Sequence, residues 1–217
     1  MKPLLILILS LSFSLAAFGQ AVKNSDEVKI GKQVWMVKNL NVSSFKNGEI
    51  IPEAKTEAEW KKATIAQKPA WCYYNDDSNN GSKYGKLYNW YAVNDKRGLA
   101  PQGWHIASDS EYSALITYLS GGSKKKDIAP SIKSKAGWED NGQGTNSSGF
   151  TALPGGACNG DGDFGDLGNT AYFWTSTEDQ NHTAALFYSV ASDDATVWQV
   201  INFKSRGFSV RCIKDSL

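Results

Sequence analysis

Histidine is scarce in this chain of 217 residues, which has two, His105 and His182. Neither stands at metal-ligand spacing from a second histidine or a cysteine, which argues against a zinc site. A Gly-x-Ser-x-Gly motif, which presents the nucleophile of many hydrolases, is missing as well. We therefore expect a protein that is not an enzyme and has no cofactor, with His105 as a structural histidine that bonds a backbone group.

Neither sign of charge dominates the chain. Lysine and arginine together number 23, aspartate and glutamate 22, and the formal net charge is +1. Proteins that bind nucleic acids or anionic membrane surfaces usually carry an excess of basic residues. The balance therefore argues against nucleic acid as a partner.

One long apolar run occurs, and it lies at the N-terminus. Lys2 precedes an apolar segment over residues 4–18, and small residues then predict signal-peptide cleavage after Gly19. The segment is shorter than the roughly 20 apolar residues that a transmembrane helix needs. We expect a signal peptide over residues 1–19, a flexible leader over 20–27, and no membrane span after cleavage. The product would be exported, to the periplasm, the outer surface or the medium.

Three cysteines, Cys72, Cys158 and Cys212, allow one disulfide and one unpaired thiol in an exported chain. Cys72 and Cys212 lie in segments with strand character, and period-two alternation places Cys212 on the face of Phe208 and Val210. Cys158 lies in a segment rich in glycine and asparagine, where we expect a loop. If one bond forms, we expect Cys72–Cys212; otherwise all three cysteines stay reduced.

Turn residues separate short apolar stretches, which predicts several β-strands. Two strands are expected around a turn at residues 31–32, and another at 104–106. Residues 184–190 and 197–203 are expected to form one hairpin, with a closing strand at 207–213.

Three helices are predicted, over residues 57–62, 84–94 and 108–120. Thr56 and Ser108 each begin a capping box, and the second helix has apolar residues at the i, i+3, i+4 and i+7 positions. From residue 128 onward, short apolar pieces alternate with clusters of glycine, asparagine and aspartate. No repeat or linker divides the chain, so we expect a single α+β domain with a loop-rich C-terminal half.

Six motifs, in order along the chain, resemble those of one known family. They are QVWMVKNLN (33–41), YGKLYNWYAV (84–93), APQGWHIASDSE (100–111), GFTALPGG (149–156), FWTSTE (173–178) and GFSVRC (207–212). Together they resemble the Fibrobacter succinogenes major paralogous domain, over about residues 28–215. That family consists of exported bacterial domains without an assigned activity.

The same motifs are distantly similar to the formylglycine-generating enzymes, which share a Gly-Trp helix entry and a terminal Gly-Phe-x-Val-Arg strand. Here Tyr112 replaces the usual tryptophan and Ala107 the usual proline. The likeness implies a C-type lectin-like domain with two main helices packed on short antiparallel sheets. It does not imply the activity, because Cys158 and Cys212 do not sit in the motif of the copper-binding cysteine pair.

The loop-rich half contains two candidate sites. An aromatic residue among amides and carboxylates suits a sugar, although an exposed turn is the simpler interpretation. The candidate sugar ligands are Trp138, Asp140, Asn141, Gln143 and Asn146.

The second candidate is a calcium loop with oxygen ligands at alternate positions, Asn159, Asp161 and Asp163. An EF-hand needs glycine and glutamate where Phe164 and Thr170 stand. Ordinary turn chemistry is therefore the competing interpretation.

These features favour an exported, non-catalytic binding or surface-interaction module with a glycan as candidate ligand. Its partner would be a polysaccharide or a cell-surface protein. The alternatives are a structural component of the cell envelope, or an enzyme on a scaffold like that of the formylglycine-generating enzymes.

Overall fold

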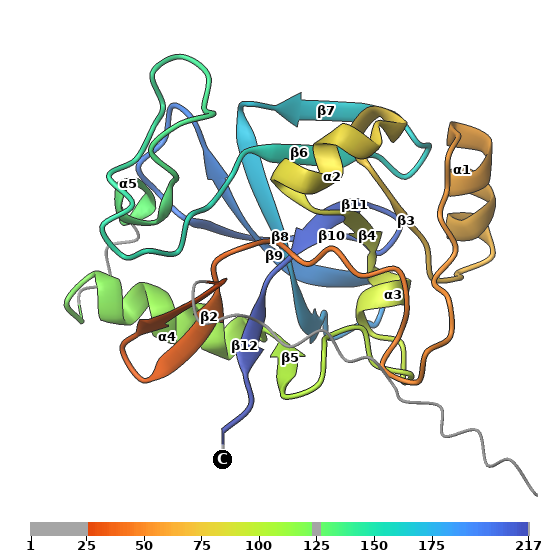
Figure 1. The fold of residues 1–217 in the computed structure, drawn as a ribbon, viewed down its shortest axis with the longest axis horizontal. Helices are drawn as coiled ribbons and strands as arrows, with labels where there is room; N and C mark the ends of the chain where they lie inside the picture. Colours follow the sequence, from red (N-terminus) through yellow and green to blue (C-terminus); the bar gives the residue numbers. More distant parts are fainter. Residues whose placement is uncertain (1–25, 123–126, 217) are drawn as a thin grey trace, which may run out of the picture.

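The chain contains both helices and mainly antiparallel sheets, with the helices in its first 132 residues and an unbroken run of strands after them, which confirms the α+β class (Figure 1). The computed structural model describes residues 26–122 and 127–216, so the predicted signal peptide lies outside the described residues. The helices are α1 (Glu57–Ile65), the 3₁₀ helix η2 (Tyr74–Asp76), α2 (Ser78–Tyr84), α3 (Trp90–Val93), α4 (Asp109–Leu119) and α5 (Ala129–Ile132). The strands are β1 (Glu27–Ile30), β2 (Gln33–Met36), β3 (Trp71–Cys72), β4 (Leu87–Asn89), β5 (Trp104–Ile106), β6 (Gly155–Cys158), β7 (Phe164–Leu167), β8 (Thr170–Glu178), β9 (Ala184–Ala191), β10 (Trp198–Phe203), β11 (Gly207–Val210) and β12 (Cys212–Lys214).

The strands form two sheets. One has four strands in the order β1-β2-β12-β5, and the other has eight, with the path β10-β9-β8-β11-β4-β3 and with β6 and β7 attached through β11. The β8–β11 pair is parallel, and the other pairs are antiparallel. The predicted closing strand over 207–213 is therefore two strands, β11 in the large sheet and β12 in the small one, which meet at Arg211.

Arg211 is completely buried at this crossing, and its guanidinium has no carboxylate partner in the described part of the chain. Its Nη1 donates to the backbone oxygens of Met36, Val37 and Phe150 at 2.7–2.8 Å, and its Nη2 donates to Asn39 Oδ1 at 2.8 Å. The Phe150 ring centroid lies 4.5 Å from the guanidinium carbon. Burial lowers the pKa of Arg211 to about 10, so the side chain stays charged at neutral pH. The contacts join the end of β2, the segment around Phe150 and both sheets.

Both predicted hairpins and two of the three predicted helices are confirmed. β1 pairs with β2 around the expected turn, although β1 begins at Glu27, inside the predicted leader, and β9 pairs with β10. At α4, Ser108 Oγ accepts from the Glu111 amide, and Glu111 Oε2 accepts from the Ser108 amide. α1 begins as expected, with the Thr56 hydroxyl accepting from a backbone amide, and it continues to Ile65.

The predicted helix over residues 84–94 is wrong. Leu87–Asn89 form strand β4, and the helical part is limited to Trp90–Val93. Gly85 has a φ of +75°, and a side chain there would collide with a backbone carbonyl, so the chain leaves α2 in a conformation that only glycine tolerates. β4 lies between β3 and β11 and is buried throughout. The helix-like spacing of apolar residues in this segment is therefore explained by a central strand that is buried on both faces.

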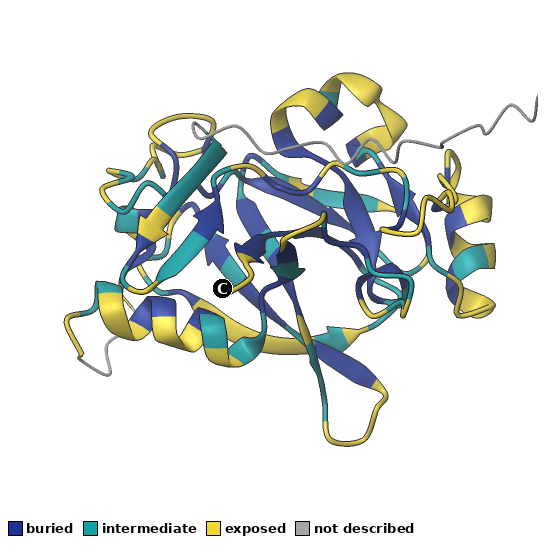
Figure 2. Cartoon of the chain, turned by 60° about the horizontal axis from the view of Figure 1, so that its bottom comes forward, coloured by how far each residue is buried: buried dark blue, intermediate teal, exposed yellow. Residues whose placement is uncertain are grey.

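The buried residues gather along the strands (Figure 2), and α4 contributes Tyr112 to this core. The Tyr112 ring stacks on Tyr188 with centroids 4.6 Å apart and lies 5.0 Å from the Trp35 ring. Its hydroxyl is buried without a hydrogen-bond partner among the described residues. A buried hydroxyl without a partner loses its hydration and gains nothing in return.

We predict that Tyr112→Phe increases the free energy of unfolding by about 1 kcal/mol or more, because it removes this uncompensated polar atom and keeps the ring. The matched control is Tyr188→Phe, whose hydroxyl is 2.9 Å from Asp109 Oδ1. That variant should lose stability. Urea unfolding of both variants measures the difference, and a destabilised Tyr112→Phe protein would contradict the assignment.

His105 connects β5 to α4 and to the C-terminal segment. Its Nε2 lies 2.7 Å from Glu111 Oε1, and its Nδ1 lies 2.7 Å from Asp215 Oδ1. The expected bond to a backbone group is therefore wrong, since two carboxylates hold this ring. Burial disfavours the imidazolium, but the two hydrogen bonds outweigh it and raise the pKa of His105. The pKa of Glu111 is lowered, because bonds from Ser108 and His105 outweigh burial.

A raised histidine pKa stabilises the fold fully below the ordinary value of about 6.5, and the contribution disappears as the pH rises through the raised pKa. The lowered pKa of Glu111 stabilises the fold at pH values above the ordinary pKa of a glutamate, and this stabilisation is lost as the pH falls. We predict that His105→Gln lowers the free energy of unfolding by up to about 1 kcal/mol near pH 5.5, and by less near pH 9. Asp215→Asn should show the same pattern in denaturant titrations. Equal losses at both pH values would refute the charged pairing.

Candidate functional site

Trp138, the aromatic centre of the predicted sugar site, is buried with 6% of its surface exposed. Its Nε1 donates to Ser134 Oγ at 2.9 Å, and Lys133 Nζ lies 5.2 Å from its ring centroid. The ring packs into the core beside α4 and β8. A sugar site at Trp138 would need an exposed ring, so the burial of Trp138 contradicts its role as a candidate sugar ligand and makes it part of the scaffold.

The other candidates for that site form turns around the buried tryptophan. Asp140, Asn141 and Asn146 have φ values of 51°, 56° and 49°, in the left-handed region that aspartate and asparagine tolerate. The Asn146 side chain bonds the backbone amide and the hydroxyl of Thr151, at 2.9 and 2.8 Å. Gln143 is exposed. Without an exposed ring, these residues do not make the expected aromatic sugar site.

The candidate calcium ligands lie at and beside the turn between β6 and β7. Asn159 Oδ1 accepts from Arg206, and Asp161 forms an ion pair with Lys61 at 3.2 Å. The Asn159 amide donates to the Asp163 carbonyl at 2.7 Å, which closes the hairpin. Within residues 26–122 and 127–216, no group of three or more histidine, cysteine, aspartate or glutamate side chains could hold a metal ion. All three residues line a shallow cleft of about 520 Å³.

The three cysteines are buried free thiols. Cys72 neighbours Cys158 in one core cluster, whereas Cys212 belongs to another, so the predicted Cys72–Cys212 bond is wrong and the alternative of three reduced thiols is observed. Cys158 lies in β6, not in a loop. Burial raises the pKa of the Cys72 thiol, and it raises that of Cys212 to about 12, which makes both unreactive.

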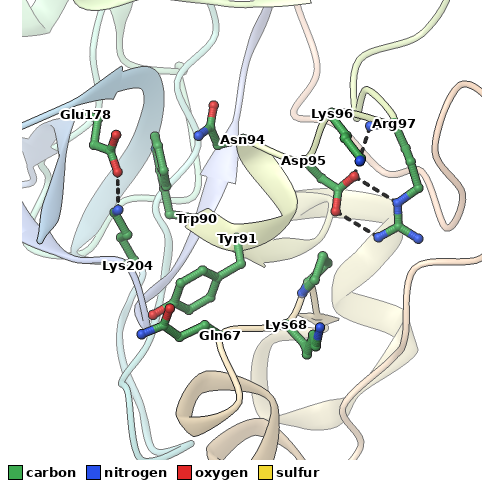
Figure 3. Close-up of a pocket in the computed structure, with 11 residues that line it drawn as sticks. Gln67, Lys68, Trp90, Tyr91, Asn94, Asp95, Lys96, Arg97, Glu178 and Lys204 are labelled. Atoms are coloured by element: carbon green, nitrogen blue, oxygen red, sulfur yellow. Dashed lines mark hydrogen bonds and ion pairs between the residues drawn. The ribbon is translucent and has the colours of Figure 1, made fainter. Parts of the chain in front are cut away.

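A larger cleft, of about 560 Å³, opens on another part of the surface (Figure 3). Four segments that are distant in sequence form it: residues 67–69 after α1, residues 90–97 of α3 and the turn beyond it, Glu178 at the end of β8, and Lys204 directly after β10. Such a volume is sufficient for a small molecule or a short segment of a polymer.

Trp90 and Tyr91 form the aromatic part of this cleft. Trp90 is almost fully buried, and its Nε1 donates to the Thr175 carbonyl at 2.9 Å. Tyr91 is partly exposed, and its ring extends to the side chain of Gln67 (Figure 3). Burial raises the pKa of Tyr91, so its hydroxyl stays neutral and can donate. Asn89 Oδ1 accepts from the Ala92 amide and fixes the start of α3 beneath these rings.

Paired charges lie on both sides of the aromatic residues. Lys204 forms an ion pair with Glu178, and its Nζ lies 4.9 Å from the Trp90 ring centroid. Arg97 holds Asp95 with two parallel bonds of 2.8 Å. Hydrogen bonds from Lys204 and His182 lower the pKa of Glu178, and those from Arg97 lower the pKa of Asp95. Both carboxylates are therefore ionised, oriented hydrogen-bond acceptors.

Sequence reasoning missed this cleft. Trp90 and Tyr91 lie in one of the family motifs, within the helix predicted over residues 84–94. In the structure the helical part of that range is limited to Trp90–Val93. Their partners lie more than 20 residues away in each direction, at Gln67 and at Glu178 with Lys204. No local pattern could bring these four segments together before the sheet order was known.

The described residues include no helix that is long and apolar enough to cross a membrane. A family model described as the Fibrobacter succinogenes major domain matches residues 28–214, as the sequence motifs predicted. No curated protein matches the chain, and no solved structure matches it either. Because the match covers nearly the whole chain, the protein belongs to the Fibrobacter succinogenes major domain family.

Proposed function

We propose that this protein is an exported, non-catalytic glycan-binding module, and that the cleft around Tyr91 holds the sugar. The observation that carries the proposal is a half-buried tyrosine ring with amides and fixed carboxylates around it. A pyranose ring has an apolar face that packs on an aromatic ring, and hydroxyls that bond amides and carboxylates. Gln67 and Asn94 supply the amides, and Asp95 and Glu178 supply the carboxylates.

The ion pairs favour binding over hydrolysis. A glycosidase needs one carboxylic acid whose pKa is raised so that it can protonate the leaving oxygen. Here the pKa values of Glu178 and Asp95 are both lowered, because Lys204 and Arg97 hold them in the ionised form. Two ionised carboxylates can accept hydrogen bonds from sugar hydroxyls, but neither can act as the acid.

The wider setting is also part of the proposal. The predicted signal peptide would deliver the chain to the cell exterior or the periplasm, where polysaccharides and cell-surface proteins are available as partners. We propose in addition that the domain is C-type lectin-like, with loops that present the cleft on a rigid core.

Tyr91→Ala should weaken retention on an array of polysaccharides and oligosaccharides by at least about tenfold, a loss of about 1.4 kcal/mol in binding free energy. The matched control is Tyr118→Ala, since Tyr118 is 61% exposed on α4 and does not line the cleft. The control should bind like the unmodified protein.

Three results would contradict this proposal. They are a protein that retains no glycan, a Tyr91→Ala variant that binds as tightly as the control, and the release of reducing sugar from a bound glycan. The last would leave the site in place and refute the non-catalytic part alone.

A further inference from the structure

β10 exposes unusually large apolar side chains. The exposed fractions are 52% for Trp198, 40% for Val200, 57% for Ile201 and 69% for Phe203. Five of its six residues are exposed and the sixth is intermediate. The neighbouring strand β9, in contrast, is mostly buried (Figure 2). Because side chains alternate along a strand, both of its faces carry apolar residues.

The outer backbone edge of β10 is also open. β10 ends the path of the large sheet, and among the described strands only β9 pairs with it. Soluble proteins usually protect such an edge with a charged residue, a proline or a bulge. The β10 sequence, Trp-Gln-Val-Ile-Asn-Phe, has no charge and no proline, and its register with β9 is regular. An apolar, unprotected edge of this kind is expected to be covered by another strand.

The charged residues beside β10 indicate which strand covers this edge. Asp194 precedes β10 and Arg206 follows it, and the two lie equally far along the sequence from Val200. Their side-chain hydrogen bonds are to neutral groups: Asp194 Oδ2 accepts from Trp198 Nε1 at 2.6 Å, and Arg206 donates to Asn159. Among the described residues neither side chain forms an ion pair, and the two ends of β10 therefore carry side chains of opposite charge.

We propose that β10 pairs with β10 of a second copy of this chain, antiparallel and about a twofold axis at Val200. A twofold axis perpendicular to the sheet keeps each face continuous, so Val200 meets Val200 of the second copy and Trp198 lies opposite Asn202. The same register brings the turn before each strand, which carries Asp194, toward the turn after the other strand, which carries Arg206. A parallel arrangement would place like charges together. The dimer would join two large sheets into one and would not depend on the proposed glycan site.

The mass of the purified protein, measured by light scattering after size-exclusion chromatography, should shift from monomer to dimer as the concentration rises. Val200→Lys should weaken the association by about tenfold or more, because it brings two positive charges together at the axis. Tyr118→Lys adds the same charge at an exposed residue of α4 and should leave the dimer unchanged. A protein that stays monomeric, or a dimer that Val200→Lys leaves intact, would overturn the proposal.

A second variant decides the matter if Val200→Lys does not fold. Under mild oxidation, Val200→Cys should give a covalent dimer on a non-reducing gel, because the two new thiols meet at the axis. Tyr118→Cys should stay monomeric under the same conditions, since the three native thiols are buried. If Val200→Cys cross-links no more than the control does, the proposed pairing is wrong. The same result is expected if another protein, and not a second copy of this chain, covers the edge.

Discussion

A buried guanidinium joins the two sheets, and the remaining architecture depends on it. Moving a charged side chain out of water costs many kcal/mol unless the protein replaces the lost hydration. Here the backbone carbonyls of Met36, Val37 and Phe150 and the Asn39 amide oxygen replace it, and no carboxylate of the described residues takes part. Because these acceptors come from separate segments, Arg211 fixes the end of β2 against the crossing from β11 to β12. The arginine of the terminal Gly-Phe-x-Val-Arg motif therefore has a structural role in this fold.

The cleft depends on the same frame through β11. This strand pairs with β4, which leads into α3, and with β8, which ends at Glu178. The Trp90 amide donates to the Lys204 carbonyl at 2.9 Å, and the Trp90 indole donates to the Thr175 carbonyl at the same distance. The aromatic part of the cleft is therefore attached both to β8 and to the segment directly after β10. A preformed site loses less conformational entropy on binding.

Local signals predicted the parts of the fold that local chemistry determines. The capping box at Ser108, the turn between β1 and β2 and the β9–β10 hairpin could all be predicted because neighbouring residues specify them. The error at residues 84–94 arose because a central strand buried on both faces has no alternation. Cys158 and Trp138 lie beside turn-rich sequence, and long-range packing buried them. The candidate cleft was beyond prediction for a related reason, since sheet order alone brings Gln67, Tyr91 and Glu178 together.

The proposed function requires that a sugar bind in the cleft beside Tyr91. A crystal structure of the protein with an oligosaccharide that it retains on the array tests this most directly. We expect a sugar ring stacked on the Tyr91 side chain, with its hydroxyls bonded to the carboxylates that Lys204 and Arg97 hold in place. A sugar bound at another surface with the cleft unoccupied would contradict the claim.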